Sequence, residues 1–499
     1  MSGVAGQRYR ARLGHGDPRP GQVLGPAVGV VLLLLLLALV VSPGSFAVSL
    51  GTPERTGPSV VASSPGPTSP SSDPRAAAPR QDLAQPEPVQ AAALAALADV
   101  LLARDGSVTS SEPAGWTAAG ADPTDTSAPD GSFVVLTSLP VTTFTSSVVP
   151  DSLRVVEDPQ DPQDPQVVGD WQARVETLYE LAGATAVVRT DTVTMAAPSD
   201  GLGWRVISWA PYPSLGQVGT AAPWDLGEVL TTVGERGVVL SWVDPGTPDD
   251  GEVPPQRVQD AQSVGDRVAS RVERGAMVVD SYFGTGWPRA TLVFAPATSE
   301  QYDALVPGPV PERPDMFAAV TTDIRTPDGG GDLVVLNPTA QDELVEETWQ
   351  VTVTHELVHV ASGARYGDGQ EVWLAEGLAD LVGWSTVVPA TVGRDAVAGR
   401  LLQRVSDRTV EVQELPDAAD FTAADPEVVG DAYEGAWLAA LLLQDELGLE
   451  ALLVTYEDAS EGPGSPRQRT GAALRAATGE GREEFQTRWT SYITTLAAR

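Results

Sequence analysis

Two of the three histidines in this 499-residue chain lie four residues apart, in the run "VTHELVHV". On a helix, residues four apart project from one face, one turn above the other. The imidazoles of His355 and His359 can therefore reach one ion together. The chain has no cysteine, so any metal must be held by nitrogen and oxygen atoms. Zinc binds neutral histidine nitrogen and is usually four-coordinate, which leaves two positions for other groups. The alternative is a histidine pair satisfied by hydrogen bonds inside a helical core.

Glu356 follows the first histidine directly, which completes the pattern HExxH. Its place on the helix is poor for binding the same ion but suits a group that takes a proton from a metal-activated water. We therefore expect Glu356 to act as a general base beside the metal.

A third ligand is expected from a neighbouring helix, in the run "EVWLAEGLADLVGW". Glu376 lies seventeen residues after His359, a spacing that allows a loop and a returning helix. Asp380 lies one turn further on, where it can accept the outer N–H of a zinc-bound histidine. The alternative is an exposed acidic stripe. Apolar neighbours favour a packed helix instead, in which buried carboxylates need partners; they are Trp373, Leu374, Leu378 and Leu381.

These motifs resemble a known family. "HELVH" followed by "WLAEGLAD" is similar to the gluzincin metallopeptidases, the group of thermolysin and aminopeptidase N. The resemblance covers the chain from about Arg257 onward and implies a zinc ion with Glu376 as its third ligand. "DAYEGAW" resembles the "YEKG" segment of the same enzymes, although it lacks the lysine. That similarity implies that the Tyr433 hydroxyl stabilises a tetrahedral intermediate.

One departure from the family concerns the strand upstream of the zinc helix. Aminopeptidases of this group carry "GxMEN" there, and its glutamate binds the free amino terminus of the substrate. The corresponding run here is "MFAAVTTDI" (residues 316–324), without a glutamate. The resemblance therefore does not extend to aminopeptidase specificity. The strand could still pair with an extended peptide at the sheet edge.

The N-terminal region indicates the compartment. Four arginines precede the nineteen uncharged residues of 23–41, which nearly cross a bilayer core as a helix. Arginines hold their side of a span in the cytoplasm, so we expect a basic tail (1–22) and a single membrane anchor (23–44) with the rest of the chain outside the cytoplasm. The alternative is a secreted protein released by signal cleavage near "SFA". A disordered Pro/Ser-rich linker is expected over 45–88.

The remaining chain predicts an α+β fold in two units. An accessory domain (89–224) begins with a helix over 89–106, ended by glycine, and continues with strand-like runs at 132–149, 184–197 and 203–209. This order resembles the cone-shaped fold of the nuclear-transport-factor-two and cystatin type. A thermolysin-like domain (225–499) follows, with strands near 236–243, 290–297, 316–324 and 329–338 and a helix over about 258–283. A long helix from about Thr339 carries the histidines, and the rest is mostly helical.

Composition narrows the partners. The formal net charge is −36, and such an acidic surface repels nucleic-acid phosphates. Nucleic acid is therefore not expected as a partner. The motifs and the family resemblance together predict a zinc-dependent peptidase that acts on peptide or protein substrates outside the cytoplasm. Two alternatives stay open: a membrane-tethered binding protein without catalysis, and a zinc hydrolase of a non-peptide amide or ester.

Overall fold

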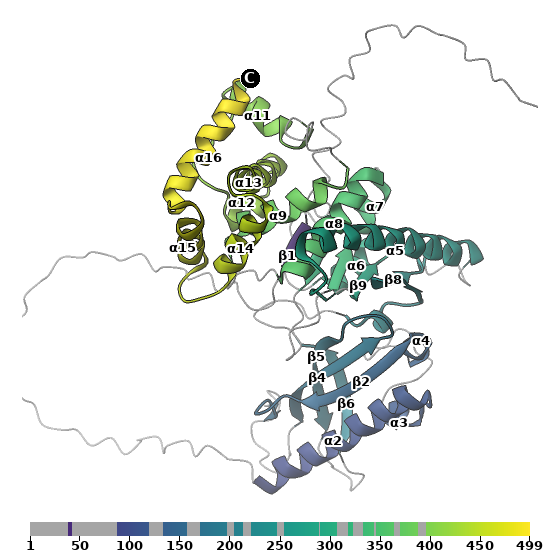
Figure 1. Cartoon of the computed structure of the whole chain (residues 1–499). Helices are drawn as coiled ribbons and strands as arrows, with labels where there is room; N and C mark the ends of the chain where they lie inside the picture. The colour runs from purple at the N-terminus through teal and green to yellow at the C-terminus, as the bar shows by residue number, and fades with distance from the viewer. Residues whose placement is uncertain are drawn as a thin grey trace, which may run out of the picture.

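Two β-sheets and a large set of helices form the described part of the chain (Figure 1). This architecture confirms the predicted α+β class. The computed structural model describes residues 38–41, 87–118, 133–156, 170–196, 204–212, 221–246, 254–288, 290–306, 318–322, 333–343, 346–363, 370–387 and 396–499.

The accessory unit is an antiparallel sheet in the order β2-β4-β5-β6, with the short β3 paired to β4. Helix α2 (Glu87–Ser110) packs on this sheet. Along β4, buried and more exposed side chains alternate, so every second residue faces the interior. The strands are β2 (Val141–Val148), β3 (Arg154–Val155), β4 (Trp171–Leu181), β5 (Val187–Ala196) and β6 (Arg205–Pro211).

The structure corrects the sequence prediction at three places in this unit. Helix α2 continues four residues past Gly106, because Ser107 and Val108 are buried and that packing outweighs the ~1 kcal/mol cost of a helical glycine. Residues Phe133–Ser138, expected as strand, form helix α4, in which Phe133, Val135 and Leu136 are buried. Strand β4, which pairs with both β2 and β5, was not predicted at all.

The second sheet has the order β1-β10-β11-β9-β8-β7. Strands β8, β9 and β11 are parallel to one another and are buried along their whole length, which explains their unbroken apolar sequences. Their positions agree with the predicted strands. The members are β1 (Ala38–Val41), β7 (Val229–Val233), β8 (Gly237–Trp242), β9 (Thr291–Ala295), β10 (Ala319–Thr322) and β11 (Leu333–Leu336).

Both faces of this second sheet are covered. Val239 of β8 belongs to the core that contains helices α5 (Pro255–Phe283) and α8 (Glu346–Ser362). Val238 and Leu240 belong to a different core, shared with Tyr179 of the accessory sheet. The accessory sheet therefore packs on one side of the second sheet and the long helices pack on the other, where α8 is held in the interior.

The region after the strands is helical, as expected. The long helix predicted from about Thr339 is two helices, α7 (Pro338–Glu343) and α8, and only α8 carries the histidines. The other elements are α3 (Ala114–Ala118), η2 (Pro223–Asp225), α6 (Ser299–Leu305), α9 (Val372–Trp384), α11 (Gly399–Ser406), α12 (Ala418–Phe421), α13 (Pro426–Leu447), α14 (Leu449–Ser460), α15 (Pro466–Thr478) and α16 (Arg482–Ala497).

Part of the expected membrane anchor has a different structure. Ala38–Val41 form strand β1, which runs parallel to β10 and lies beside α8 (Figure 1). These four residues therefore form a strand and not the helix that a membrane anchor predicts. Strand β10 has neighbours on both sides, so it offers no free edge for the extended peptide that it could have paired with. Among the described residues, no helix is long and apolar enough to cross a membrane. The rest of the 23–44 segment, and residues 45–86 of the predicted linker, lie outside the described residues.

Candidate metal centre

Helices α8 and α9 supply the predicted metal ligands. In α8 every residue from Thr348 to Val360 is buried, because the helix lies between the sheet and the C-terminal helices. His355 and His359 project from the same face, as their spacing requires. Helix α9 packs against α8 and brings Glu376 to the two imidazoles.

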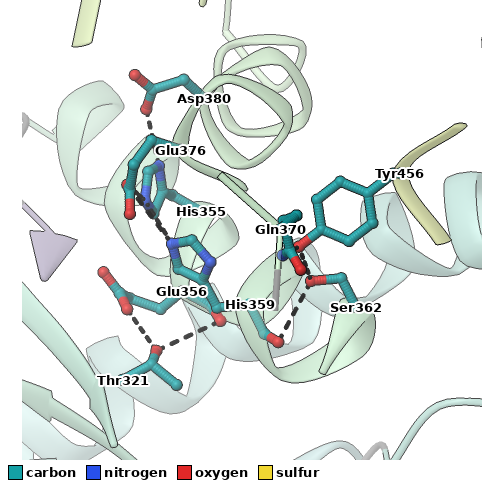
Figure 2. A network of polar contacts seen from close by, with 9 residues as sticks. All are labelled: Thr321, His355, Glu356, His359, Ser362, Gln370, Glu376, Asp380 and Tyr456. Atoms are coloured by element: carbon teal, nitrogen blue, oxygen red, sulfur yellow. Dashed lines mark hydrogen bonds and ion pairs between the residues drawn. The ribbon is translucent and has the colours of Figure 1, made fainter. Parts of the chain in front are cut away.

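The three side chains converge on one point (Figure 2). The Nε2 atoms of His355 and His359 are 2.9 Å apart, and the Glu376 Oε2 atom lies 3.1 Å from the first and 3.7 Å from the second. One possible ligand atom from each residue lies within 4.8 Å of the others. All three side chains are at most 2 % exposed. Two nitrogens and one oxygen at this separation match a zinc site with three protein ligands.

Asp380 gives an independent indication that a cation fits here. Its Oδ1 atom lies 2.7 Å from Nδ1 of His355, and an ionised carboxylate only accepts hydrogen bonds. Nδ1 therefore donates a hydrogen bond to Asp380, and Nε2 is the nitrogen that faces the Glu376 carboxylate. The positive charge that the two carboxylates favour at this place can be a proton on His355 or a metal cation bound through Nε2. A zinc ion satisfies this donor set, and a carboxylate behind the histidine orients it.

Neighbouring charges and burial shift the pKa values of these three side chains in opposite directions. Burial alone would raise the pKa of Glu376, but the imidazoles of His359 and His355 outweigh burial and lower that pKa to about 2. Burial also disfavours the charged form of His355, but Asp380 and Glu376 outweigh it and raise its pKa well above the ordinary value. Burial lowers the pKa of His359. Glu376 is therefore an anion at neutral pH, as a metal ligand must be.

Glu356 lies beside this centre and does not join the ligand group. It is fully buried, and burial raises its pKa to about 7. The Thr321 hydroxyl of strand β10 donates a hydrogen bond to Oε2 of Glu356 (Figure 2). Within the described structure Oε1 has no hydrogen-bond partner. One carboxylate oxygen is therefore fixed while the other can accept a proton, and a pKa near neutrality suits a general base.

Thr321 was not predicted as a site residue. Its run was read as a strand, and the only signal was a polar pair at the end of an apolar stretch. Which face Thr321 occupies depends on its register with Val334 of β11 and on the packing of β10 against α8. Neither the register of β10 nor its packing against α8 can be predicted from the local sequence.

Tyr433 of α13 lies at the same centre. Its ring centroid is 6.4 Å from that of His355, and its hydroxyl hydrogen-bonds the Glu376 carboxylate. Gly377 allows this approach, because a Cβ atom there would lie 2.3 Å from the Ala436 carbonyl oxygen of α13. Burial and the neighbouring carboxylates raise the pKa of Tyr433 well above its usual value, so the phenol keeps its proton and can donate it in a hydrogen bond.

A second polar network supports the other end of α8. Ser362 donates to the His359 carbonyl at 3.4 Å and lies 3.0 Å from the Tyr456 hydroxyl, which also accepts from the Gln370 amide (Figure 2). These residues join α8, the start of α9 and α14. Nothing in the sequence pattern indicated this network.

Comparisons with known proteins give little further information. No protein-family model matches the chain, and no curated protein does either. Similar solved structures include a two-domain M1 zinc metallopeptidase bound to L-tryptophan, one bound to L-arginine, and an M1 zinc metallopeptidase from Deinococcus radiodurans bound to a Tyr-Ser-Ala substrate.

Each of these three is 14 % identical to this chain and covers 70 % of it, with TM-scores of 0.29, 0.30 and 0.29. This chain spans 61 % of the length of each one. Similarity this weak carries no argument about activity, so the function is inferred from the geometry of the site.

Proposed function

We propose that this protein is a zinc-dependent peptidase. The observation that carries the proposal is the convergence of His355, His359 and Glu376 on one buried point, with Glu356 beside them. A pair of histidines in a structural core would not need an anionic third partner and an unpaired carboxylate oxygen at the same place. Zinc held by these three residues would polarise a substrate carbonyl and lower the pKa of a water molecule.

The protein side chains then have separate roles. Glu356 accepts the proton of the attacking water through Oε1 and passes it to the leaving amine, while Thr321 holds the other oxygen in place. The Tyr433 hydroxyl donates a hydrogen bond to the oxyanion that develops on the carbonyl oxygen. Asp380 keeps the Nδ1 proton of His355 and so fixes which nitrogen faces the metal.

Location and partners belong to the same proposal. A membrane anchor or signal segment ahead of strand β1 would place the centre outside the cytoplasm, where it would meet peptide or protein substrates. The absence of cysteine removes any need for a reducing compartment. The acidic composition supports the exclusion of nucleic acid as a partner.

The decisive experiment is Glu356→Gln in the full chain. Because general acid–base catalysis contributes ~10²–10⁴-fold, we expect kcat on a peptide library to fall at least ~100-fold while bound zinc is unchanged. Glu347→Gln is the matched control, since Glu347 is an exposed carboxylate on the same helix. It should keep full activity. Chelator treatment should abolish cleavage, and added zinc should restore it.

The outcomes separate the alternatives. Near-native cleavage by the Glu356→Gln protein contradicts the assignment of the base, and a protein that stays metal-free after zinc supplementation contradicts the whole proposal. Stoichiometric zinc with no cleavage of any substrate indicates a binding protein instead. Zinc-dependent cleavage of esters or non-peptide amides alone identifies a different hydrolase.

A further inference from the structure

Arg104 of helix α2 is a buried cation far in sequence from the metal centre. Its side chain lies inside the accessory unit and the residue is 4 % exposed. No hydrogen bond or ion pair in the described part of the chain involves it, and its Nη1 atom is buried without a partner. Taking a charge out of water is costly unless the charge is paired and hydrogen-bonded. A guanidinium has five N–H donors, and here Nη1 is the nitrogen that is buried without an acceptor.

Aromatic rings surround the guanidinium but do not satisfy those donors. The carbon Cζ of Arg104 lies over the Trp116 ring at 4.2 Å from its centroid and over the Trp209 ring at 4.1 Å. The Phe144 ring is 5.4 Å away. Ring faces attract a cation, so this packing offsets part of the cost of burial. It supplies no oxygen atom for the guanidinium edge.

The nearby carboxylates are hydrogen-bonded to groups other than Arg104, although Oδ1 of Asp225 is buried without a partner. Arg189, a second buried arginine of this unit, binds Asp191 at 2.7 Å and Asp225 at 2.9 Å. The Asp105 carboxylate accepts the Ser146 amide and hydroxyl hydrogen bonds, each at 2.7 Å. One of the two buried arginines is thus fully paired while the other has no anion of its own.

The indole rings on either side of the guanidinium also carry N–H donors without hydrogen-bond partners. The Nε1 donors of Trp116 and Trp209 are also buried without a partner. One stack of side chains from α2, α3 and β6 therefore carries three buried N–H donors without a hydrogen-bond partner. A planar carboxylate fits this arrangement, because its two oxygens bind a guanidinium in a bidentate way and can accept further N–H groups.

We propose that the accessory unit binds a small carboxylate-bearing ligand at Arg104, between Trp116 and Trp209. Burial lowers the pKa of Arg104 to about 10, which leaves the side chain charged at neutral pH. The competing explanation is that ordered water alone satisfies the donors, and it predicts no preference for any anion. The test of this site includes no peptidase assay, so its result does not depend on whether the proposed peptidase function is correct.

The test uses the full chain with sodium acetate and sodium propionate as probes. Thermal unfolding is followed against probe concentration, with sodium chloride and sodium phosphate at equal ionic strength for comparison. Ligand-observed NMR saturation transfer to the probe's own protons measures contact directly. We expect a saturable rise of the unfolding midpoint with the carboxylates, and at least tenfold weaker binding in Arg104→Met.

Arg174→Met is the matched control, because Arg174 lies over the Tyr212 ring at 5.2 Å in the same unit but is only half-buried. Its binding should equal wild type. If Arg104→Met does not fold, Arg104→Lys keeps the charge without the planar fork, and at least tenfold weaker binding is again expected. No saturable carboxylate binding, an equal response to chloride or phosphate, or undiminished binding in the Arg104 variants would overturn the proposal.

Discussion

Replacing Asp380 by asparagine tests the metal centre through a residue that does not touch the metal. The Oδ1 atom of Asp380 lies 2.7 Å from Nδ1 of His355, and Asp380 is 1 % exposed. Asparagine keeps the size but removes the charge. Hydrogen bonds to charged groups contribute ~1.5–3 kcal/mol and neutral ones ~0.5–1.5 kcal/mol, a difference of ~1–2 kcal/mol. Since ~1.4 kcal/mol is tenfold in affinity, zinc binding should weaken ~5–30-fold.

That range overlaps the ~10–100-fold losses typical when a partner behind a metal ligand is removed. The dissociation constant for zinc is measured near neutral pH by competition with a chelator of known affinity. Peptidase activity should return at saturating zinc, because the three ligands stay in place. A larger loss that zinc cannot restore would indicate that His355 had rotated away.

The control is Glu371→Gln, which alters a carboxylate at the start of the same helix. Glu371 binds Arg482 at 2.7 Å and lies outside the metal-ligand group, so zinc affinity should be unchanged although stability falls. If Asp380→Asn binds zinc within twofold of wild type, Asp380 does not orient His355 and the reasoning fails. Equal loss in both variants would trace the effect to a loosened helix α9.

Two other predictions concern side chains that the structure places. Thr321→Val removes the hydroxyl that holds Glu356, so kcat should fall ~10-fold or more with little change in KM or bound zinc, and Thr321→Ser should restore it. Thr352→Val is the control, because the Thr352 hydroxyl is buried on α8 without a partner. Equal kcat values for the Thr321→Val and Thr352→Val proteins would refute the role of Thr321 in holding Glu356. Burial raises the pKa of Glu434 to about 7, above its unfolded value, so the native state binds more protons and wild-type stability should fall as pH rises from ~4.5 through ~7. The free energy of unfolding should fall by at most ~3 kcal/mol over this range. Urea unfolding of the Glu434→Gln protein should show no such fall. If the wild type and this variant lose stability in parallel as pH rises, the prediction is contradicted.

The parts of the site that depend on short spacing were predictable from the amino-acid sequence. Histidines four apart on a helix share one face, and a buried carboxylate on the next amphipathic helix needs a cation. The structure brings His355, His359 and Glu376 together and places Asp380 against Nδ1 of His355. The parallel strands were also predictable from sequence. A strand that is covered on both faces is apolar along its length and does not alternate between apolar and polar residues.

Helix and strand ends were less predictable from local signals. Gly106 suggested the end of α2, but burial of the following residues extends the helix. Within the run at 132–149, helix α4 forms because three of its side chains pack into the core shared with the second sheet. In each case tertiary packing overrides a local preference of about 1 kcal/mol.

Which distant residues meet at the centre depends on long-range packing. Thr321 reaches Glu356 through the register of β10 against β11, and Tyr433 reaches Glu376 because Gly377 lets α13 approach α9 closely. Strand β1 pairs with β10 across 281 positions of sequence, with Val40 opposite Thr321. Local periodicity fixes which face a residue occupies, but it carries no information about which other face will lie against it. Which faces pack against each other is determined by contacts between residues that are far apart in the sequence.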